Sequence, residues 1–138
     1  MDLVIDANII FAALIKDDFT RFLLFRENIT LCAPEFIFTE IEKYSKEIYR
    51  KSGRTHEELE NVLNVLIRRI HIIPKEEIIQ FIAHTKTISP DPKDVPYMAL
   101  PLKRKIPIWS NDKKLKNNQK TITVYTTEEI NKKTKQQF

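Results

Sequence analysis

The sequence has very little glycine and cysteine, with one residue of each among 138. One glycine cannot form a glycine-rich phosphate-binding loop, so nucleotide-binding proteins that depend on such a loop are excluded. The single cysteine, Cys32, excludes an internal disulfide framework and a multi-cysteine zinc site, and it is typical of a reducing compartment. No apolar run approaches the roughly 18 residues that cross a bilayer, and Asp2 and Asp6 interrupt any signal-peptide pattern. We therefore expect a single soluble, cytoplasmic domain over residues 1–138, with no membrane partner.

Charge is divided unevenly along the chain. Residues 103–138 contain ten lysines and arginines against three acidic residues, whereas residues 1–102 are weakly acidic, and the whole chain carries +4. A basic segment of this kind favours a polyanionic partner, with nucleic acid the first candidate. A solvated lysine-rich tail explains the same composition equally well, so charge alone leaves both interpretations open.

Short apolar runs alternate with segments of helical periodicity. The runs that predict strands are residues 3–5, 29–33, 70–73, 106–109 and 121–125, and the segments that predict helices begin near residues 7, 18, 35, 55, 74, 94 and 126. Strands that alternate with helices are typical of a layered α/β domain. We therefore expect a three-layer α/β/α sandwich around a central, mostly parallel sheet of four to five strands.

Local signals predict several helix boundaries. After Pro34, a long helix is expected from about residue 35 to residue 51, with Gly53 as its left-handed terminator. Thr55 and Glu58 match a capping box that opens the next helix. Pro101 is expected to kink the helix that starts near residue 94, or to end it early.

Two aspartates follow strands of the predicted sheet. Asp6 closes the first apolar run, and Asp112 comes just after the fourth. Ligands of open parallel sheets bind beyond the carboxyl ends of the strands, so both aspartates should lie at the same edge. Each is also a favoured N-cap of a following helix, which is the structural alternative for either residue alone.

Glu40 shares a face of the long predicted helix with apolar residues. Its neighbours one turn away include Phe36 and Tyr44, whereas Glu42 lies about 200° away around the helix. A carboxylate on an inward face is costly unless it is paired or binds a metal. An ion pair with Lys43 or with a distant arginine is the alternative to a metal site.

Asp91 and Asp94 frame a turn at the start of the helix predicted from about residue 94. Either of them can cap this helix, which leaves the other free. The sequence has no Gly-x-Ser-x-Gly elbow, and with glycine loops and cysteine chemistry also excluded, carboxylates are the reactive groups that remain. Carboxylates suit hard cations such as Mg²⁺ and Mn²⁺, so the pattern favours a carboxylate metal site.

Four segments form an ordered series along the chain: residues 4–8 (Val-Ile-Asp-Ala-Asn), Glu40, residues 94–100 (Asp-Val-Pro-Tyr-Met-Ala-Leu) and residues 108–112 (Ile-Trp-Ser-Asn-Asp). In their order and spacing, these segments resemble the PIN-domain ribonuclease family. The resemblance spans nearly the whole chain. It implies a parallel sheet between helices, in agreement with the fold expected from the strand and helix pattern.

The resemblance also implies roles for individual residues. It implies an acidic cluster that binds Mg²⁺ or Mn²⁺ and carries out catalysis, formed by Asp6, Glu40, Asp94 and Asp112. It implies polar residues that support this cluster, namely Asn8, Asp91 and Ser110. Lysines that flank the acidic positions are expected to guide the RNA backbone, and these are Lys93, Lys113 and Lys114.

Members of this family are metal-dependent nucleases that cut single-stranded or structured RNA, and many prokaryotic members are toxins neutralised by a small antitoxin. By resemblance we expect a metal-dependent endoribonuclease that leaves a 5′-phosphate and a 3′-hydroxyl. Its expected partners are RNA, an antitoxin and a second copy of the chain. The alternative is a catalytically weak or inactive module of the same fold that binds RNA or a protein. A phospho-acceptor receiver domain is set aside, because it needs an aspartate after the third strand, where Ile73 and Pro74 stand.

Overall fold

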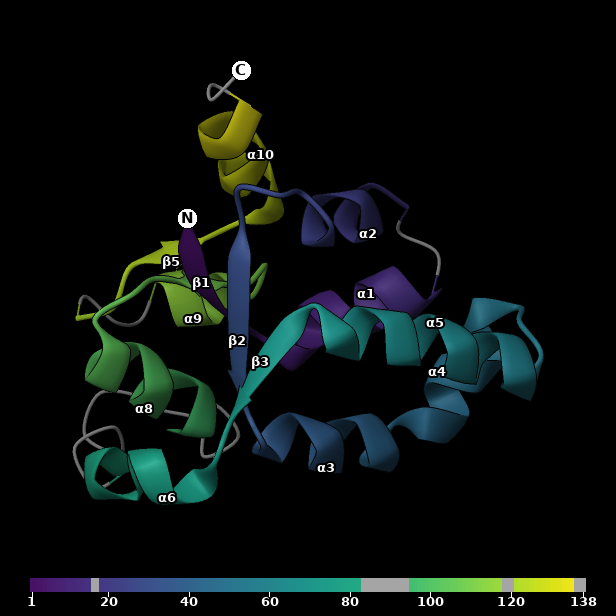
Figure 1. Ribbon diagram of the computed structural model, residues 1–138, viewed down its shortest axis with the longest axis horizontal. Coiled ribbons are helices and arrows are strands. Elements are labelled where there is room, and N and C mark those ends of the chain that lie inside the picture. Colours follow the sequence, from purple (N-terminus) through teal and green to yellow (C-terminus); the bar gives the residue numbers. More distant parts are fainter. Residues whose placement is uncertain (16–17, 83–94, 118–120, 136–138) are drawn as a thin grey trace.

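The computed structural model describes residues 1–15, 18–82, 95–117 and 121–135, and in these residues five strands form one parallel sheet (Figure 1). The strands are β1 (Asp2–Ile5), β2 (Thr30–Pro34), β3 (Ile70–Ile73), β4 (Ile108–Trp109) and β5 (Val124–Tyr125). Their order across the sheet is β3-β2-β1-β4-β5, and each neighbouring pair is parallel. The predicted α/β fold with a mostly parallel central sheet is confirmed.

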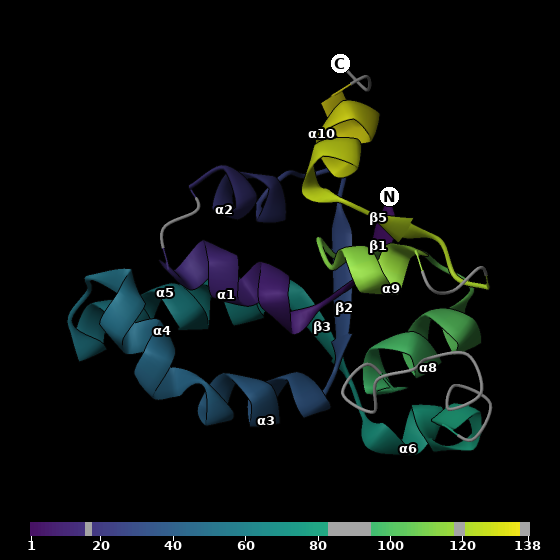
Figure 2. The same ribbon diagram turned by 180° about the vertical axis from the view of Figure 1, so that it is seen from behind.

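Helices cover both faces of this sheet (Figures 1 and 2). The described helices are α1 (Ala7–Ile15), α2 (Asp18–Leu24), α3 (Phe36–Lys43), α4 (Ser45–Ser52), α5 (His56–Arg68), α6 (Lys75–Ile78), the 3-10 turn η1 (Ile79–Phe81), α8 (Val95–Arg104), α9 (Lys113–Asn117) and α10 (Thr127–Lys135). Helix α8 packs on β1, β2 and β4, whereas α5 contacts β3 and α1. Crossovers between parallel strands are right-handed, so the return of the chain from β3 to β4 places α8 on the face opposite α1.

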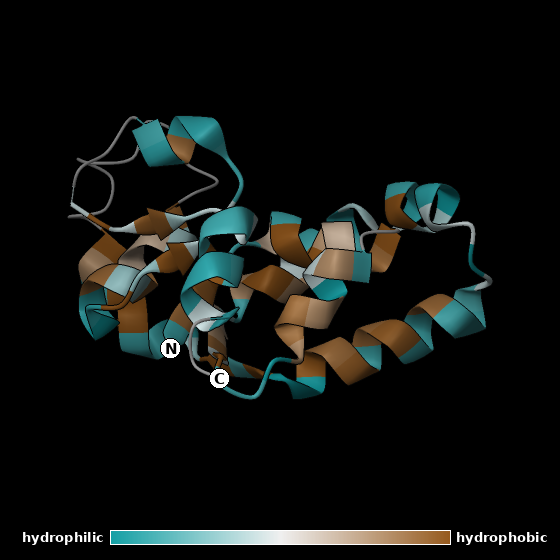
Figure 3. Cartoon of the chain, turned by 90° about the horizontal axis from the view of Figure 1, so that it is seen from above, coloured by the Kyte–Doolittle hydropathy of each residue, from teal (hydrophilic) through white to brown (hydrophobic). Residues whose placement is uncertain are grey.

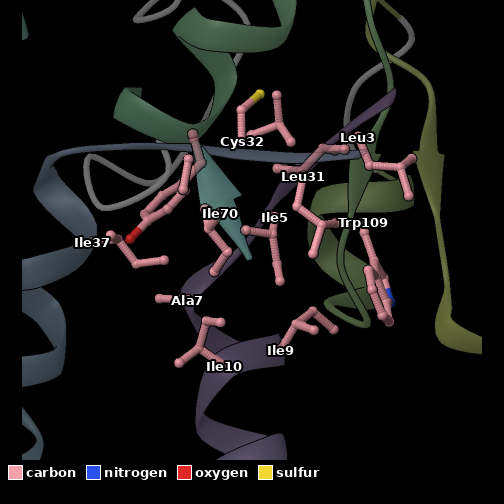
Figure 4. Packing of buried hydrophobic residues seen from close by; sticks show 14 of the residues in the cluster. Leu3, Ile5, Ala7, Ile9, Ile10, Leu31, Cys32, Ile37, Ile70 and Trp109 are labelled. Carbon is pink, nitrogen blue, oxygen red and sulfur yellow. The ribbon is translucent and has the colours of Figure 1, made fainter. Parts of the chain in front are cut away.

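The core fills the space between the sheet and its helices. Strand β1 is buried on both faces, as its wholly apolar run predicts. Figure 4 shows Ile5 and Ile70 reaching toward Ile9 and Ile10 of α1, while Cys32 points to the other side of the sheet. Apolar and polar residues lie side by side along the helices (Figure 3), because a covering helix has one face toward the core and one toward solvent. No helix in the described parts of the chain is long and apolar enough to cross a membrane.

Two predicted boundary signals are confirmed. Gly53 follows α4 with φ 67° and ψ 15°, the left-handed conformation that glycine adopts without a steric penalty. Thr55 and Glu58 form the complete capping box at the start of α5, with the Thr55 hydroxyl accepting from the Glu58 amide at 3.1 Å. These two adjacent signals explain the sharp turn between α4 and α5.

The prediction of a single long helix over residues 35–51 is wrong. The chain forms two helices here, α3 and α4, which meet at Tyr44. Tyr44 has φ −100° and ψ 11°, and its amide donates back to the carbonyl of Glu40 at 3.1 Å, which closes α3. Both α3 and α4 contact α1, so the break lets the pair follow α1 closely. The segment contains no glycine or proline, the usual sequence signals of a kink, so its composition gives no warning of the break.

Pro101 does not end its helix early, since α8 continues to Arg104. The helix ends instead at Lys105, which has a positive φ of 58° and whose amide donates to the Pro101 carbonyl at 2.7 Å. The last two strands are shorter than predicted, because only residues 108–109 and 124–125 form ladder pairs.

Candidate active site

Asp6 and Asp112 lie at the same edge of the sheet, as predicted from their positions after strands. Asp6 directly follows β1, and Asp112 lies three residues beyond Trp109, the end of the neighbouring strand β4. The Asp6 amide donates to the Trp109 carbonyl at 3.1 Å, which extends the ladder to the point where the aspartate begins. Parallel pairing therefore brings together two carboxylates that are more than a hundred residues apart in the sequence.

Ser110 connects the two aspartates. Its hydroxyl donates to Oδ2 of Asp6 at 2.7 Å and accepts from the backbone amide of Asp112 at 3.1 Å. The Ser110 side chain is fully buried, so this hydroxyl has no access to water. Its two hydrogen bonds hold the Asp6 carboxylate and the chain before Asp112 in a fixed relative position.

The environment of Asp6 opposes its ionisation. Burial raises the pKa of the Asp6 carboxyl above its usual range, and the nearby Asp112 carboxylate raises it further. Hydrogen bonds from Ser110 and from the backbone amides of Asn8 and Ala7 act in the opposite direction but do not cancel the effect of burial. Asp6 is only 9% exposed, so a negative charge here needs a compensating positive charge.

Asp112 is both a helix cap and a residue of the site. Its Oδ1 accepts from the backbone amides of Lys114 at 2.9 Å and Leu115 at 3.3 Å, which caps the start of α9. It also lines the cleft that contains Asp6. The capping role considered in the sequence is therefore correct, and the same side chain still faces the cleft.

A cleft of about 430 Å³ opens at this edge of the sheet. It is lined by four of the residues proposed from the sequence, namely Asp6, Asn8, Glu40 and Asp112. Glu40 reaches it from α3 and is half-buried, whereas Glu42 of the same helix is exposed and is not among the residues that line the cleft. Helical spacing thus predicted correctly which of these two glutamates faces inward.

Several other residues line the cleft and were not predicted. They come from α1, from the α3–α4 segment and from α8, and they are Phe11, Ile15, Tyr44, Glu47, Ile48, Lys51 and Tyr97. The residues on α4 follow Glu40 at intervals of three and four, so continuing the helical series from Glu40 would have identified them. Glu47 and Lys51 form an ion pair at 2.7 Å, and Lys51 holds the pKa of Glu47 below its usual value.

Three predicted site residues, Asp91, Lys93 and Asp94, lie outside the described residues. Lys113 and Lys114 are exposed on the first turn of α9, directly after Asp112, and they do not line the cleft.

Within residues 103–117 and 121–135, the basic side chains of the last quarter of the chain do not gather on one surface. Helix α10 begins beside the site, where the Thr127 amide donates to the side chain of Asn111. Its other end lies near the start of β2, where the Asn28 side chain donates to the Thr134 carbonyl at 3.0 Å. Figure 1 shows this helix at the end of the sheet opposite α3. The lysines near the end of α10 are therefore far from the cleft, and Lys116 on α9 is paired with Glu129 at 2.5 Å.

The donor chemistry of the cleft fits a hard divalent cation. The carboxylates of Asp6, Glu40 and Asp112 all line it, and the pKa of Asp6 is raised by burial and by its acidic neighbour, a cost that a bound cation would remove. Within the described ranges, no three His, Cys, Asp or Glu side chains come close enough together to hold one ion. The described carboxylates thus supply part of a ligand set.

Comparisons with known proteins bear on the family and the fold of the chain. A family model described as PIN domain matches residues 4–135. A solved structure, VapBC2 from Rickettsia felis bound to a DNA fragment from their promoter, has a similar fold, with a TM-score of 0.70 and 15% sequence identity. The superposition covers 91% of this chain and 98% of that chain. No curated protein matches the sequence.

Proposed function

This chain belongs to the PIN-domain family, and from that premise we propose that it is a metal-dependent endoribonuclease that hydrolyses RNA phosphodiester bonds. The observation that carries the proposal is the convergence of Asp6 and Asp112, joined through Ser110, in one cleft with Glu40. Capping of α9 explains the position of Asp112 but not the buried Asp6 beside it, whose pKa is raised by burial and by the Asp112 carboxylate. Binding of Mg²⁺ or Mn²⁺ in a nuclease would explain the arrangement, because the cation would compensate the negative charge of the carboxylates.

By resemblance to the family, the metal would be held by Asp6, Glu40, Asp94 and Asp112. The three described carboxylates of this set line one cleft but do not by themselves meet at a single ion position. When bound, it lowers the pKa of a water molecule and neutralises charge on the scissile phosphate. Ser110 keeps the Asp6 carboxylate in one orientation, and the amides at the start of α9 do the same for Asp112.

Other residues support the acidic cluster or attract the substrate. Asn8, exposed at the start of α1, offers an amide side chain at the cleft wall. Asp91 is assigned a supporting role beside Asp94. Lys93, Lys113 and Lys114 attract the RNA backbone toward the cleft mouth by charge.

RNA cleavage in the presence of Mn²⁺ tests this function. Asp6→Asn is expected to lower the rate by at least about 100-fold, because it removes a metal ligand. Asp2→Asn is the matched control, since Asp2 is exposed at the other end of the same strand. Equal cleavage by Asp6→Asn and wild-type protein would overturn the assignment.

The second candidate is a module of the same fold that binds RNA or a protein and has little activity. The exposed lysines of α9 and α10 favour it, because RNA binding needs no carboxylates. Salt-dependent RNA binding that is unchanged by Asp6→Asn, together with no cleavage in Mn²⁺, would support this alternative.

The proposal includes a toxin role in the cytoplasm, with a small antitoxin as partner and a homodimer as the assembly. Its support is the family, many of whose prokaryotic members act in this way, and the fold shared with VapBC2. Inducing the wild-type chain in a bacterial host should arrest growth, whereas Asp6→Asn should not. Equal growth of the two strains would contradict the toxin role, and light scattering of the purified chain would test the dimer.

A further inference from the structure

The cleft extends beyond its carboxylates into a groove between α1 and α4. Helix α1 contributes Phe11 and Ile15, which follow Asn8 at intervals of three and four residues. The break between α3 and α4 contributes Tyr44, and α4 adds Ile48 one turn later. The lining therefore changes from acidic at the sheet edge to aromatic and apolar along the groove.

Phe11 and Tyr44 form an aromatic pair inside this groove. Their ring centroids are 5.6 Å apart and their planes meet at 63°, an edge-to-face arrangement that holds the two rings in a defined orientation. Both side chains are only half-buried, so part of each ring is open to the cleft. The ammonium group of Lys43, an exposed side chain, lies over the Tyr44 ring at 5.3 Å from its centroid, which adds a positive charge to the aromatic pair.

The groove has polar groups beyond the aromatic pair. The Glu47–Lys51 ion pair lines it further along α4, and both side chains are about half exposed. A flat aromatic ligand with a polar edge fits this groove. Its face can contact the two aromatic rings, and its edge can hydrogen-bond with Lys51 as donor and Glu47 as acceptor. The cleft volume of about 430 Å³ lies within the range of small-molecule sites.

We propose that this groove is a subsite for one nucleobase of single-stranded RNA, which stacks on the Phe11–Tyr44 pair while its backbone passes the carboxylates. The proposal rests on the proposed nuclease function, because that function identifies the nucleic acid that enters the cleft. Aromatic side chains bind unpaired bases of any sequence, whereas a base inside a duplex is already stacked and paired. Tyr44 is thus a residue that selects unpaired RNA.

Binding of a short single-stranded adenosine oligonucleotide tests the subsite against an abasic strand of the same length and charge. Fluorescence anisotropy is measured in EDTA, so that neither strand is cleaved and repulsion from the carboxylates affects both equally. Wild-type protein should bind the adenosine strand about tenfold more tightly, which is the effect of stacking one base. Tyr44→Leu should remove this preference, and Tyr44→Phe, which keeps the ring, should retain it.

Tyr49→Leu is the matched control, because Tyr49 also lies on α4 but stacks on His56 outside the cleft. Wild-type protein that binds both strands equally, or neither, would overturn the subsite, as would a preference that survives Tyr44→Leu. Cleavage in Mn²⁺ is measured separately on the same proteins. A base preference without cleavage would overturn the nuclease function while leaving the stacking subsite supported.

Discussion

The hydroxyl of Ser110 lies 2.7 Å from Oδ2 of Asp6 and connects the ends of two neighbouring strands, β1 and β4. Both groups are buried, and the same hydroxyl accepts from the Asp112 amide. One small side chain therefore positions two of the carboxylates assigned to the metal. The stability and the chemistry of this edge of the sheet should both depend on it.

Ser110→Ala should destabilise the protein by about 1–3 kcal/mol, because it removes one hydrogen bond from the buried Asp6 carboxyl group and the hydrogen bond of the Asp112 amide. Urea unfolding at neutral pH measures this change. Ser45→Ala, at an exposed position, is the control. A free energy of unfolding equal to that of the wild type would show that the Ser110–Asp6 hydrogen bond has no net stabilising effect.

Asp6→Asn should raise the melting temperature of the metal-free protein near neutral pH. Burial raises the pKa of Asp6 in the folded protein, so folding favours the protonated carboxyl group. The stability that this group contributes is fully present below its pKa in the unfolded chain, and it is lost as pH rises through its pKa in the folded protein. The advantage of Asp6→Asn over wild type should therefore grow with pH. Melting curves in EDTA from acidic to neutral pH measure it, and a difference that is constant with pH would contradict the assignment of this effect to ionisation.

Cys32 should react very slowly with iodoacetamide in the native protein. Burial raises the pKa of its thiol from 9.0 to about 11, which lowers the reactive thiolate fraction at pH 8 by about 100-fold. Mass spectrometry after timed alkylation gives the rate. The same reaction in denaturant is the control, and equal rates in the two conditions would show that the thiol is accessible and normally acidic in the folded state.

Glu129→Gln should lower the free energy of unfolding by about 0.5–1 kcal/mol at neutral pH. Glu129 connects α10 to α9 through its ion pair with Lys116, and it also accepts a hydrogen bond from the Thr126 amide at 3.1 Å. Its hydrogen bond with Lys116 lowers the Glu129 pKa, so the stabilisation is present above the unfolded-state pKa and is lost as pH falls through the folded-state pKa. Urea unfolding at two pH values should show the two proteins converging in acid. Glu128→Gln is the control, because Glu128 pairs only with Lys132 of its own helix among the described ion pairs.

The sequence was most informative where one local signal determines the structure. Fully apolar strands predicted a parallel sheet, and Asp6 and Asp112 could be placed at one edge because parallel strands end on the same side. Glu40 could be distinguished from Glu42 because the helix repeat puts them on different faces. These inferences need no knowledge of distant contacts.

Features that depend on tertiary packing were not predictable. The break at Tyr44 follows from the fit of α3 and α4 against α1, and residues 35–51 contain no glycine or proline to signal it. The basic last quarter of the chain is a second example. Its composition left a nucleic-acid surface and a solvated lysine-rich tail equally open. In the structure, α10 leads away from the cleft toward the start of β2 and carries its lysines with it.

The most direct test of the central claim is the rate of Mn²⁺-dependent RNA cleavage by Glu40→Gln compared with Glu42→Gln. The two residues lie on the same helix, the substitutions change the charge identically, and only Glu40 lines the cleft. A contaminating ribonuclease would act equally in both preparations. We predict a loss of at least about 100-fold for Glu40→Gln and a wild-type rate for Glu42→Gln. Equal rates for the two variants would contradict the claim that the carboxylates of this cleft carry out the reaction.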